Sequence, residues 1–154
     1  MIFSHKEKPR LTLRRNDPEN PLSSYSPFAF ELDGYEWPTV EHYYNAMKYG
    51  DEKYVEKIRN APLPADAEKL GKSRWHKKRK DWNKVKLTVM TRGTYIKCRT
   101  HPEIAKMLLD TGDIEITEVS LYDYFWGLGR DQRGDNAFGK MLMDIRDKLR
   151  EEQE

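Results

Sequence analysis

The fold is decided by residues 37–49, which read WPTVEHYYNAMKY. Pro38 and Thr39 open a helix with Thr39 as its N-cap, because a threonine hydroxyl accepts a hydrogen bond from a backbone N–H of the first turn. Apolar side chains then recur at the spacing of one helical face, at Val40, Tyr43, Tyr44 and Met47. We therefore predict a helix from Thr39 to Tyr49 that buries this face and ends at Gly50.

The same helix carries a polar stripe. Glu41, Asn45 and Lys48 are four and three residues apart, so at about 100° per residue they share one side of the helix. Two interpretations are open. Charges on a solvated helix face are common and need no function. The helix is also rich in rings, at His42, Tyr43, Tyr44 and Tyr49, and a charge covered by such neighbours needs a partner or a chemical role.

The residues before this helix predict short strands. Residues 27–32 and 35–37 flank Asp33-Gly34, a dipeptide that adopts the positive φ angles of a type I′ turn, so we predict a hairpin. Alternation at residues 11–13 predicts another strand.

Five further helices and a strand are predicted downstream. The helices lie around residues 54–58, from 64 to about 71, from 81 to about 99, from 102 to before Gly112, and from about Asn136 onward. Residues 114–119 alternate and predict the strand. The long helix is expected to bury Trp82, Val85, Val89 and Ile96, and the last to bury Phe138, Met141, Leu142, Ile145 and Leu149. The class is therefore α+β and mainly α-helical, a single compact domain with a small β-sheet.

The loop between the last strand and the last helix is long and rich in aromatics, Gly and Asp. Residues 122–129, YDYFWGLG, combine an acid, a large ring and glycines that let backbone approach a ligand. The alternative is a plug of core aromatics with turn glycines. Residues 134–136 place backbone N–H groups at a helix start, which is either an anion cradle or an ordinary cap.

Composition narrows the protein class. The chain has 154 residues, 37% hydrophobic and 35% charged, with four Trp, nine Tyr and five Phe, which suffices for one folded domain. No run reaches the roughly 18 apolar residues of a membrane span, and the first residues lack a secretory apolar segment, so we expect a cytoplasmic protein without membrane contact. The oligomeric state stays open.

The sequence contains little that indicates a metal site, a redox-active cysteine or a nucleic-acid binding surface. Cys98 is the single cysteine and is expected to be a buried helix residue, and the histidines at 5, 42, 76 and 101 have no ligand spacing, so no metal or organic cofactor is implied. The net charge is only +2. Residues 72–80 concentrate basic side chains, which we interpret as a solvated charge run in preference to a phosphate-steering segment.

Several separated motifs together resemble the NADAR, or YbiA-like, family. They are LSSYSP at residues 22–27, WPTVEHYYNAMKY at 37–49, RKDW at 79–82, Lys97, HPE at 101–103, LLDTGD at 108–113, Glu118, Asp123, Trp126-Gly127, Gly129, Gly134, Asn136, Gly139 and Leu142-Met143. The resemblance covers about residues 21–149. It places the domain at 21–150, after an N-terminal extension of residues 1–20.

The resemblance implies an N-glycosidase of the ribosyl C–N bond. Family substrates are phosphorylated ribosylaminopyrimidine intermediates of riboflavin synthesis and ADP-ribose on guanine, so the expected partner is a nucleotide or an ADP-ribosylated nucleic acid. Glu41, Lys48 and Asp123 match positions implicated in catalysis, and Trp126 is expected to stack a base. Further substrate contacts are expected from Tyr44, Asn45, Ser23, Gly127 and Asn136.

The chain also departs from the family pattern. Ser24 stands where the family usually has Asn, and Leu128 where Asp is frequent, and both changes remove polar groups that could contact substrate. Phe is usual at the positions of Tyr49 and Cys98. These departures bear more on the substrate than on the fold.

Two mechanisms and two rival functions are open. Lys48 attacks C1′ of the ring-opened sugar while Glu41 moves protons, or Glu41 or Asp123 activates water while Lys48 only binds. The main rival is a module that binds ADP-ribose or a related nucleotide without cleaving it. The weaker rival is a nucleic-acid binding domain that uses residues 72–80, which steep salt dependence of DNA binding would support.

Overall fold

The structure, a computed structural model, describes residues 8–154, so His5 and the first residues of the predicted extension lie outside the described part. Contacts cluster in two compact units. We call Arg15–Met107 the helical unit, and the segment up to Arg14 together with Leu108–Glu154 the terminal unit.

The helical unit contains the predicted hairpin. Strands β2 (Phe30–Leu32) and β3 (Tyr35–Trp37) pair antiparallel, with Phe30 opposite Trp37. The turn has φ of 56° at Asp33 and 84° at Gly34, the two positive angles that a type I′ turn requires. The indole Nε1 of Trp37 donates to the Leu32 carbonyl at 3.0 Å. The hairpin therefore delivers the chain directly into the next helix.

Helix α1 (Val40–Ala46) begins as predicted and ends early. The hydroxyl of Thr39 accepts from the His42 N–H at 3.1 Å, which confirms the N-cap. The predicted extension to Tyr49 is wrong. The N–H groups of Lys48 and Tyr49 donate to carbonyls three residues back, at 3.3 and 3.2 Å, which tightens the chain into a turn. The Lys48 carbonyl instead accepts from the Arg79 N–H at 2.8 Å.

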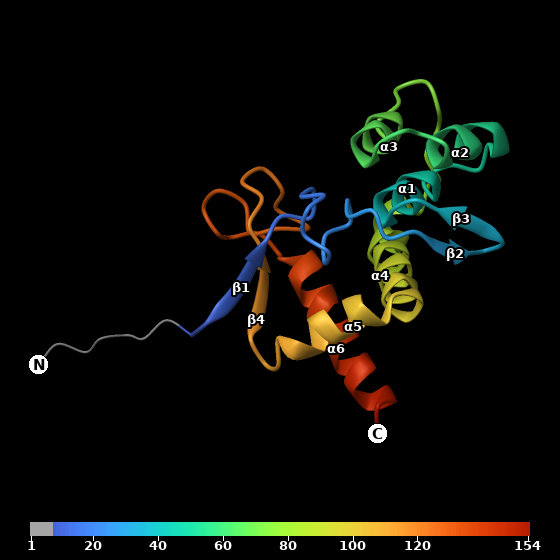
Figure 1. The fold of residues 1–154 in the computed structure, drawn as a ribbon. Helices are drawn as coiled ribbons and strands as arrows, with labels where there is room; N and C mark the ends of the chain where they lie inside the picture. Colours follow the sequence, from blue (N-terminus) through green and yellow to red (C-terminus); the bar gives the residue numbers. More distant parts are fainter. Residues whose placement is uncertain (1–7) are drawn as a thin grey trace, which may run out of the picture. The chain divides into compact units, whose positions relative to one another are not determined.

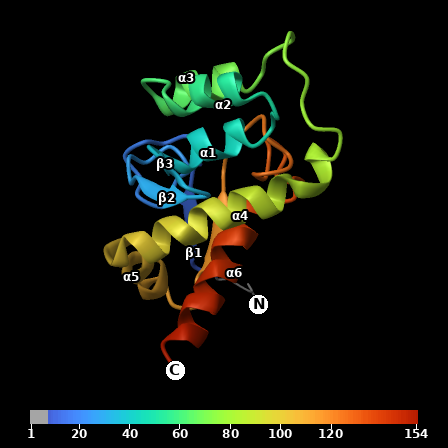
Figure 2. The same cartoon turned by 90° about the vertical axis from the view of Figure 1, so that its right-hand side faces the viewer.

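Helices surround α1 within the helical unit. They are α2 (Glu52–Arg59), α3 (Pro64–Leu70) and α4 (Trp82–Thr100), as Figures 1 and 2 show. Every residue of α1 is buried. Gly93 permits the approach of α4, because a Cβ there would lie 2.9 Å from Cδ1 of Tyr43. The helix that carries the polar stripe is therefore a core helix.

The buried face of α4 differs partly from the prediction. Trp82 and Val89 are buried as expected, whereas Val85 and Ile96 are only half-buried. Their places are taken by Met90, Thr94, Lys97 and Cys98, all buried. Apolar character alone does not identify this face, because the buried side of α4 includes a threonine and a lysine with polar partners. The burial of Cys98 is confirmed.

The terminal unit contains the other sheet. Strands β1 (Arg10–Leu13) and β4 (Glu115–Glu118) pair parallel, with Leu13 opposite Glu118, and both were predicted. Figure 1 shows them side by side, with α6 (Ala137–Glu152) next to them. The five core residues predicted for α6 are all buried. Helix α5 (Pro102–Asp110) leads the chain into this unit.

The predicted class, α+β and mainly α-helical, is confirmed, and the strands form two sheets of two strands each within residues 8–154. In the described part of the chain, no helix is both long and apolar enough to cross a membrane.

Candidate functional site

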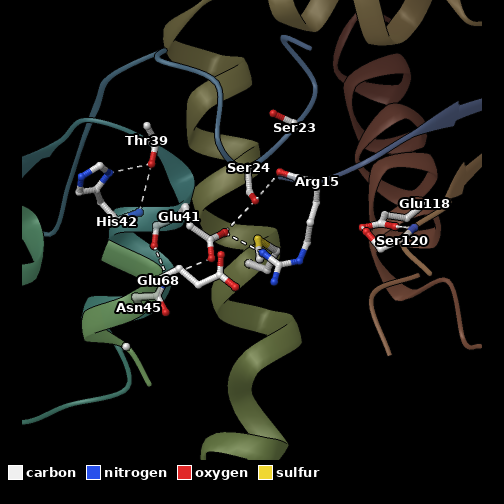
Figure 3. A network of polar contacts seen from close by, with 12 residues as sticks. Arg15, Ser23, Ser24, Thr39, Glu41, His42, Asn45, Glu68, Glu118 and Ser120 are labelled. Carbon is white, nitrogen blue, oxygen red and sulfur yellow. Dashed lines mark hydrogen bonds and ion pairs between the residues drawn. The ribbon is translucent and has the colours of Figure 1, made fainter. Parts of the chain in front are cut away.

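Glu41 is a fully buried carboxylate that three donors hold in place. It lies in the first turn of α1 and is 0% exposed. Its Oε2 accepts from Arg15 Nη1 and from Ser24 Oγ, each at 2.8 Å, and its Oε1 accepts from Asn45 Nδ2 at 3.0 Å (Figure 3). A buried carboxylate is stable only when such partners replace water. All three partners are donors, which matches the ionised, acceptor-only form of the group.

Arg15 was missed by the sequence analysis. It lies 26 residues before Glu41 and belongs to no periodic segment. Ser24, which we expected to have lost a polar contact, donates its one hydroxyl proton to Glu41, and the Arg15 carbonyl lies 3.0 Å from the same hydroxyl oxygen. The Ser24 N–H donates to the Arg15 carbonyl at 3.1 Å. The Glu41 N–H in turn donates to the Ser24 carbonyl at 2.9 Å. The segment of residues 15–24 therefore binds the Glu41 carboxylate through the side chains at both of its ends, Arg15 and Ser24.

Lys48 lies beyond the end of α1 but still reaches the polar stripe. Its Nζ donates to Asn45 Oδ1 at 2.8 Å and to the Gly71 carbonyl at 3.3 Å. It also lies 5.2 Å from the ring centre of Tyr44 and 5.8 Å from that of Trp82. Asn45 therefore bridges the two charged groups, with its amide nitrogen on Glu41 and its oxygen on Lys48.

The surroundings change the acidity of Lys48. Its pKa is lowered to about 8, chiefly by burial and then by the positive charge of Lys78, while the Glu41 carboxylate opposes the change. Arg15 and Lys72 add smaller lowering contributions. With a pKa of about 8, roughly one lysine in ten is neutral at pH 7, against fewer than one in a thousand for an ordinary lysine. The site therefore holds an amine that can act as a nucleophile.

Gly71 follows α3, whose end was predicted at about this residue, and it also packs against the side chain of Asn45. A Cβ at this position would lie 2.0 Å from Asn45 Oδ1 and 2.7 Å from Asn45 Cγ. Its carbonyl also accepts from Tyr49 Oη at 3.0 Å. The end of α3 therefore touches the amide that bridges Glu41 and Lys48. In Figure 3 the side chain of Glu68, from α3, lies beside the side chains of Glu41 and Arg15.

Two predicted substrate contacts in the helical unit have partners within the fold. The ring of Tyr44 is 6% exposed and lies 5.0 Å from that of Trp82. Ser23 is 0% exposed, its hydroxyl donates to the Asp17 carbonyl, and its own carbonyl accepts from Lys97 Nζ at 2.9 Å. Their contacts with substrate stay predictions.

The histidines in the described residues have packing or surface roles, as predicted. His42 is buried, its ring nitrogens face Thr39 Oγ1 at 2.8 Å and the Ala61 carbonyl at 2.9 Å, and burial lowers its pKa. His76 is exposed and stacks on Tyr54. Within residues 8–154, no group of three or more His, Cys, Asp or Glu is placed to hold a metal ion.

The terminal unit holds Asp123 and Trp126. One carboxylate oxygen of Asp123 accepts the N–H groups of Phe125 and Trp126, at 3.1 and 2.8 Å, and so fixes a turn. Trp126 is 4% exposed, with its ring 4.7 Å from Phe125 and 6.5 Å from Phe138. These contacts favour the core-plug interpretation of the aromatic loop. Acid–base work by Asp123 and base stacking by Trp126 stay predictions.

Gly127 and Asn136 shape the same loop. A Cβ on Gly127 would lie 2.7 Å from Glu118 Oε1 and 3.0 Å from the Asp123 carbonyl. Asn136 has φ of 50°, its Nδ2 donates to the Ile116 carbonyl at 3.0 Å, and its Oδ1 accepts from the Glu118 N–H at 2.8 Å. Both amide groups are thus used inside the unit. Substrate binding by either residue stays a prediction.

Of the two interpretations of residues 134–136, the structure contradicts the anion cradle at the start of α6. The N–H groups of residues 134, 135 and 136 donate to the carbonyls of Leu128, Tyr124 and Gly127, at 2.7, 2.8 and 3.1 Å. Donors already bonded to backbone cannot hold an anion. Nearby, the buried Glu118 carboxylate accepts from the N–H and hydroxyl of Ser120 (Figure 3), a pairing that no sequence pattern indicated. The N-cap residue Asn136 has a left-handed backbone and makes no side-chain cap hydrogen bond, so loop carbonyls satisfy this end of the helix.

The predicted residues therefore form two groups. Glu41, Asn45 and Lys48 share one hydrogen-bonded cluster in the helical unit, while Asp123, Trp126, Gly127 and Asn136 lie in one loop of the terminal unit. A groove of about 560 Å³ between α2 and α3 is lined by other residues, among them Lys57, Asn60 and Lys69. It includes none of the predicted site residues.

Comparison with known proteins identifies the family of this chain. The NADAR domain model matches residues 3–150. N-glycosidase YbiA of Escherichia coli is 36% identical over 134 residues, covering 87% of this chain and 84% of that protein, and N-glycosidase Npun_R5314 of Nostoc punctiforme is 37% identical, covering 84% and 85%. The chloroplastic riboflavin biosynthesis protein PYRR of Zea mays is 34% identical, but only 23% of its length is matched.

The fold is shared as well. The NMR structure of E. coli YbiA superimposes with a TM-score of 0.84 at 33% identity, covering 98% of this chain and 91% of that one.

Proposed function

We propose, since the chain belongs to the NADAR domain family, that this N-glycosidase hydrolyses the ribosyl C–N bond of a ribosylamine nucleotide. The observation that carries the proposal is the cluster of Glu41, Asn45 and Lys48. It places a buried carboxylate and a lysine with a pKa of about 8 on opposite sides of one bridging amide.

The reaction sets two requirements. Positive charge develops at C1′ as the bond breaks, and the departing nitrogen needs a proton. The Glu41 carboxylate supplies fixed negative charge in a site from which water is largely excluded. Lys48, 7% exposed, supplies either a proton or a nucleophilic amine, depending on its charge state.

We favour the route in which Lys48 forms a Schiff base. In the ring-opened sugar, Nζ of Lys48 bonds to C1′, and the C1′–N bond to the base then breaks as the nitrogen leaves with a proton. Water adds to the resulting lysine imine and releases the sugar aldehyde and the free lysine. The lowered pKa supports this route, because it removes most of the penalty for deprotonating the amine.

Direct activation of water by Glu41 is less favoured. Three donors already occupy its oxygens, so one of these hydrogen bonds must break before the group can take a proton from water. In this alternative Lys48 stays charged and only binds. Activation of water by Asp123 is a further version of the same route.

The substrate is proposed to carry phosphate. Arg15, Lys72 and Lys78 are cations that act on Lys48. Arg15 is paired with Glu41, and Lys72 with Glu68. Within residues 8–154, Lys78 is therefore the one of the three that adds unpaired positive charge beside the amine. Such a field favours a phosphorylated substrate. A ribosylaminopyrimidine phosphate is the first candidate, supported by the similarity to a riboflavin biosynthesis protein. ADP-ribosylated guanine is the second.

Product analysis by mass spectrometry tests the function. The wild type, Glu41→Gln and the matched control Glu56→Gln, an exposed position on α2, are each incubated with a ribosylaminopyrimidine phosphate and with ADP-ribosylated guanosine. Release of the free aminopyrimidine from the first substrate, or of ADP-ribose and guanosine from the second, by the wild type and the control but not by Glu41→Gln is the expected result. No release from either substrate, with tight ADP-ribose binding retained, would instead indicate a binding module.

A further inference from the structure

A basic loop joins α3 to α4 and carries an exposed tryptophan. We define the basic loop as residues 72–80, which read KSRWHKKRK. Figure 2 shows this segment of the helical unit as a long connection that rises away from both helices. All of its residues except Ser73 are exposed, and Trp75 is 93% exposed. An indole so open to water gains nothing from the folded core, so burial does not account for it.

Most of the positive charge on the basic loop is not neutralised by the fold. Lys72 pairs with Glu68 at 3.1 Å, and Arg79 forms two hydrogen bonds to Asp81, at 2.6 and 2.9 Å. In the described part of the chain, the four remaining cations have no ion-pair partner; they are Arg74, Lys77, Lys78 and Lys80. They present a local positive field around the indole.

The backbone of the basic loop is fastened on both sides of Trp75. On one side, Ser73 Oγ accepts the N–H groups of Trp75 and His76, at 3.1 and 3.2 Å. On the other, the His76 ring stacks on Tyr54 at 3.5 Å with an interplanar angle of 13°. The Arg79 N–H then donates to the Lys48 carbonyl at 2.8 Å. The indole is therefore displayed from a preformed loop, which lowers the entropic cost of binding a partner.

We propose that the basic loop binds single-stranded nucleic acid, with Trp75 stacking on a base and Arg74, Lys77 and Lys78 contacting phosphates. One aromatic ring suffices for a base, since every base has a π face, and flanking cations match the spacing of charge along the strand. Anchoring of an anionic membrane is the less suitable alternative, because Trp75 is the one apolar side chain among the nine of the basic loop.

This inference goes beyond the proposed reaction, and the binding itself requires no hydrolysis. The bond from Arg79 to the Lys48 carbonyl ties the basic loop to the backbone of the reactive lysine. Lys78, one of the residues proposed to contact phosphate, also acts on the charge of Lys48. The basic loop would thus allow the enzyme to act on a ribosylamine nucleotide carried by a polynucleotide.

Fluorescence anisotropy with a labelled 12-nucleotide single strand that carries no ADP-ribose tests the proposal. Trp75→Ala is expected to weaken binding about 5- to 150-fold, the range measured for one stacked base. The double variant Lys77→Ala/Lys78→Ala is expected to reduce the slope of log affinity against log salt by about 1.4.

Two matched controls accompany these variants. Lys53→Ala/Lys57→Ala removes two exposed charges from α2 of the same unit, and Tyr122→Ala removes a ring that is 85% exposed in the terminal unit. Both are expected to leave binding of the strand within about twofold. Thermal unfolding checks that all variants fold.

The proposal is overturned if Trp75→Ala binds as tightly as the wild type, or if the α2 control loses as much affinity as the loop variant. Binding to anionic phosphatidylserine vesicles with none to the oligonucleotide would assign the basic loop to membranes and equally overturn it. Because the probe carries neither ADP-ribose nor a ribosylamine, either result leaves the proposed N-glycosidase reaction to be judged by its own product analysis.

Discussion

Two buried lysines of the helical unit have similarly lowered pKa values and different surroundings. The pKa values of Lys48 and Lys97 are both lowered to about 8, and in both residues burial is the main cause. The Nζ of Lys97 donates to the Ser23 carbonyl at 2.9 Å and to Ser26 Oγ at 2.7 Å. Lys97 therefore fastens the segment that carries Ser24 against α4.

The difference lies in the charges nearby. Lys48 shares a bridging amide with the Glu41 carboxylate and is affected by three further cations. Among residues 8–154, the titratable group that acts on Lys97 is the Cys98 thiol. A lowered pKa thus reports burial and does not by itself identify a catalytic residue. The carboxylate is what distinguishes the proposed reactive lysine from the structural one.

The largest expected effect separates the two lysines by substitution. Lys48→Met should lower kcat/KM by at least about 10⁴, because loss of a covalent nucleophile removes the whole catalytic unit. Lys97→Met should stay within about tenfold of the wild type, since it acts on the site only through the Ser23 segment. Steady-state release of free base measures both. Equal losses in the two variants would remove the distinction.

The second effect uses pH to identify the lysine that titrates. If neutral Lys48 attacks, the rate rises with the fraction of free amine, about fiftyfold between pH 6 and pH 8 for a pKa of about 8. Lys97→Met should keep this profile unchanged. A rate that falls above pH 8 would instead show that Lys48 works as a cation, which is the water-activation route.

The third effect concerns the bridging amide. Gly71→Ala places a methyl group 2.0 Å from Asn45 Oδ1, which displaces Asn45 and is expected to destabilise the fold by about 1–3 kcal/mol and to slow hydrolysis about tenfold. Gly50→Ala is the matched control, because nothing lies within 4 Å of its Cβ position. Urea unfolding and turnover are compared for the two. A Gly71→Ala variant indistinguishable from the control would show that the bridge tolerates displacement.

The smallest effect is on stability at Lys97. Lys97→Met removes a buried charge but also a donor to two oxygens, so the change at pH 7 should be within about 1 kcal/mol. In the wild type, the folded lysine loses its proton near pH 8 while the unfolded one keeps it to about 10.5, so this residue adds stability as pH rises through that window.

Urea unfolding between pH 7.5 and 9 measures this contribution. Above pH 9 the raised pKa of the Cys98 thiol, about 11, opposes it, because the unfolded thiol ionises first. Lys97→Met should flatten the rise below pH 9. An unchanged pH dependence would mean that another group, such as Lys48, provides all of it.

Local rules were sufficient for most of the fold. The Asp33-Gly34 turn, the Thr39 cap and the alternation of strands β1 and β4 were predictable because each depends on neighbouring residues alone. The early end of α1 was not predictable, because it depends on the capture of the Lys48 carbonyl by Arg79, 31 positions along the chain. Helix periodicity correctly predicted that Lys48 lies beside Asn45, although Lys48 lies in a turn after α1 and not in the helix.

The site was predictable in its charged core and not in its surroundings. Glu41, Asn45 and Lys48 share a local pattern, and Asn45 does link the other two. Arg15, Ser24 and Gly71 reach this group only through tertiary structure, and no spacing in the sequence indicates them. The anion cradle failed for the related reason that loop carbonyls compete for the same N–H groups.

Borohydride trapping during turnover tests the central claim most directly. The wild type is mixed with a ribosylaminopyrimidine phosphate, reduced, digested and mapped by mass spectrometry. The account predicts one sugar adduct, on the peptide that contains Lys48, and none on the peptide that contains Lys97. Active turnover without an adduct on Lys48, or an adduct on Lys97, would contradict the claim that the carboxylate beside Lys48 selects the reactive lysine.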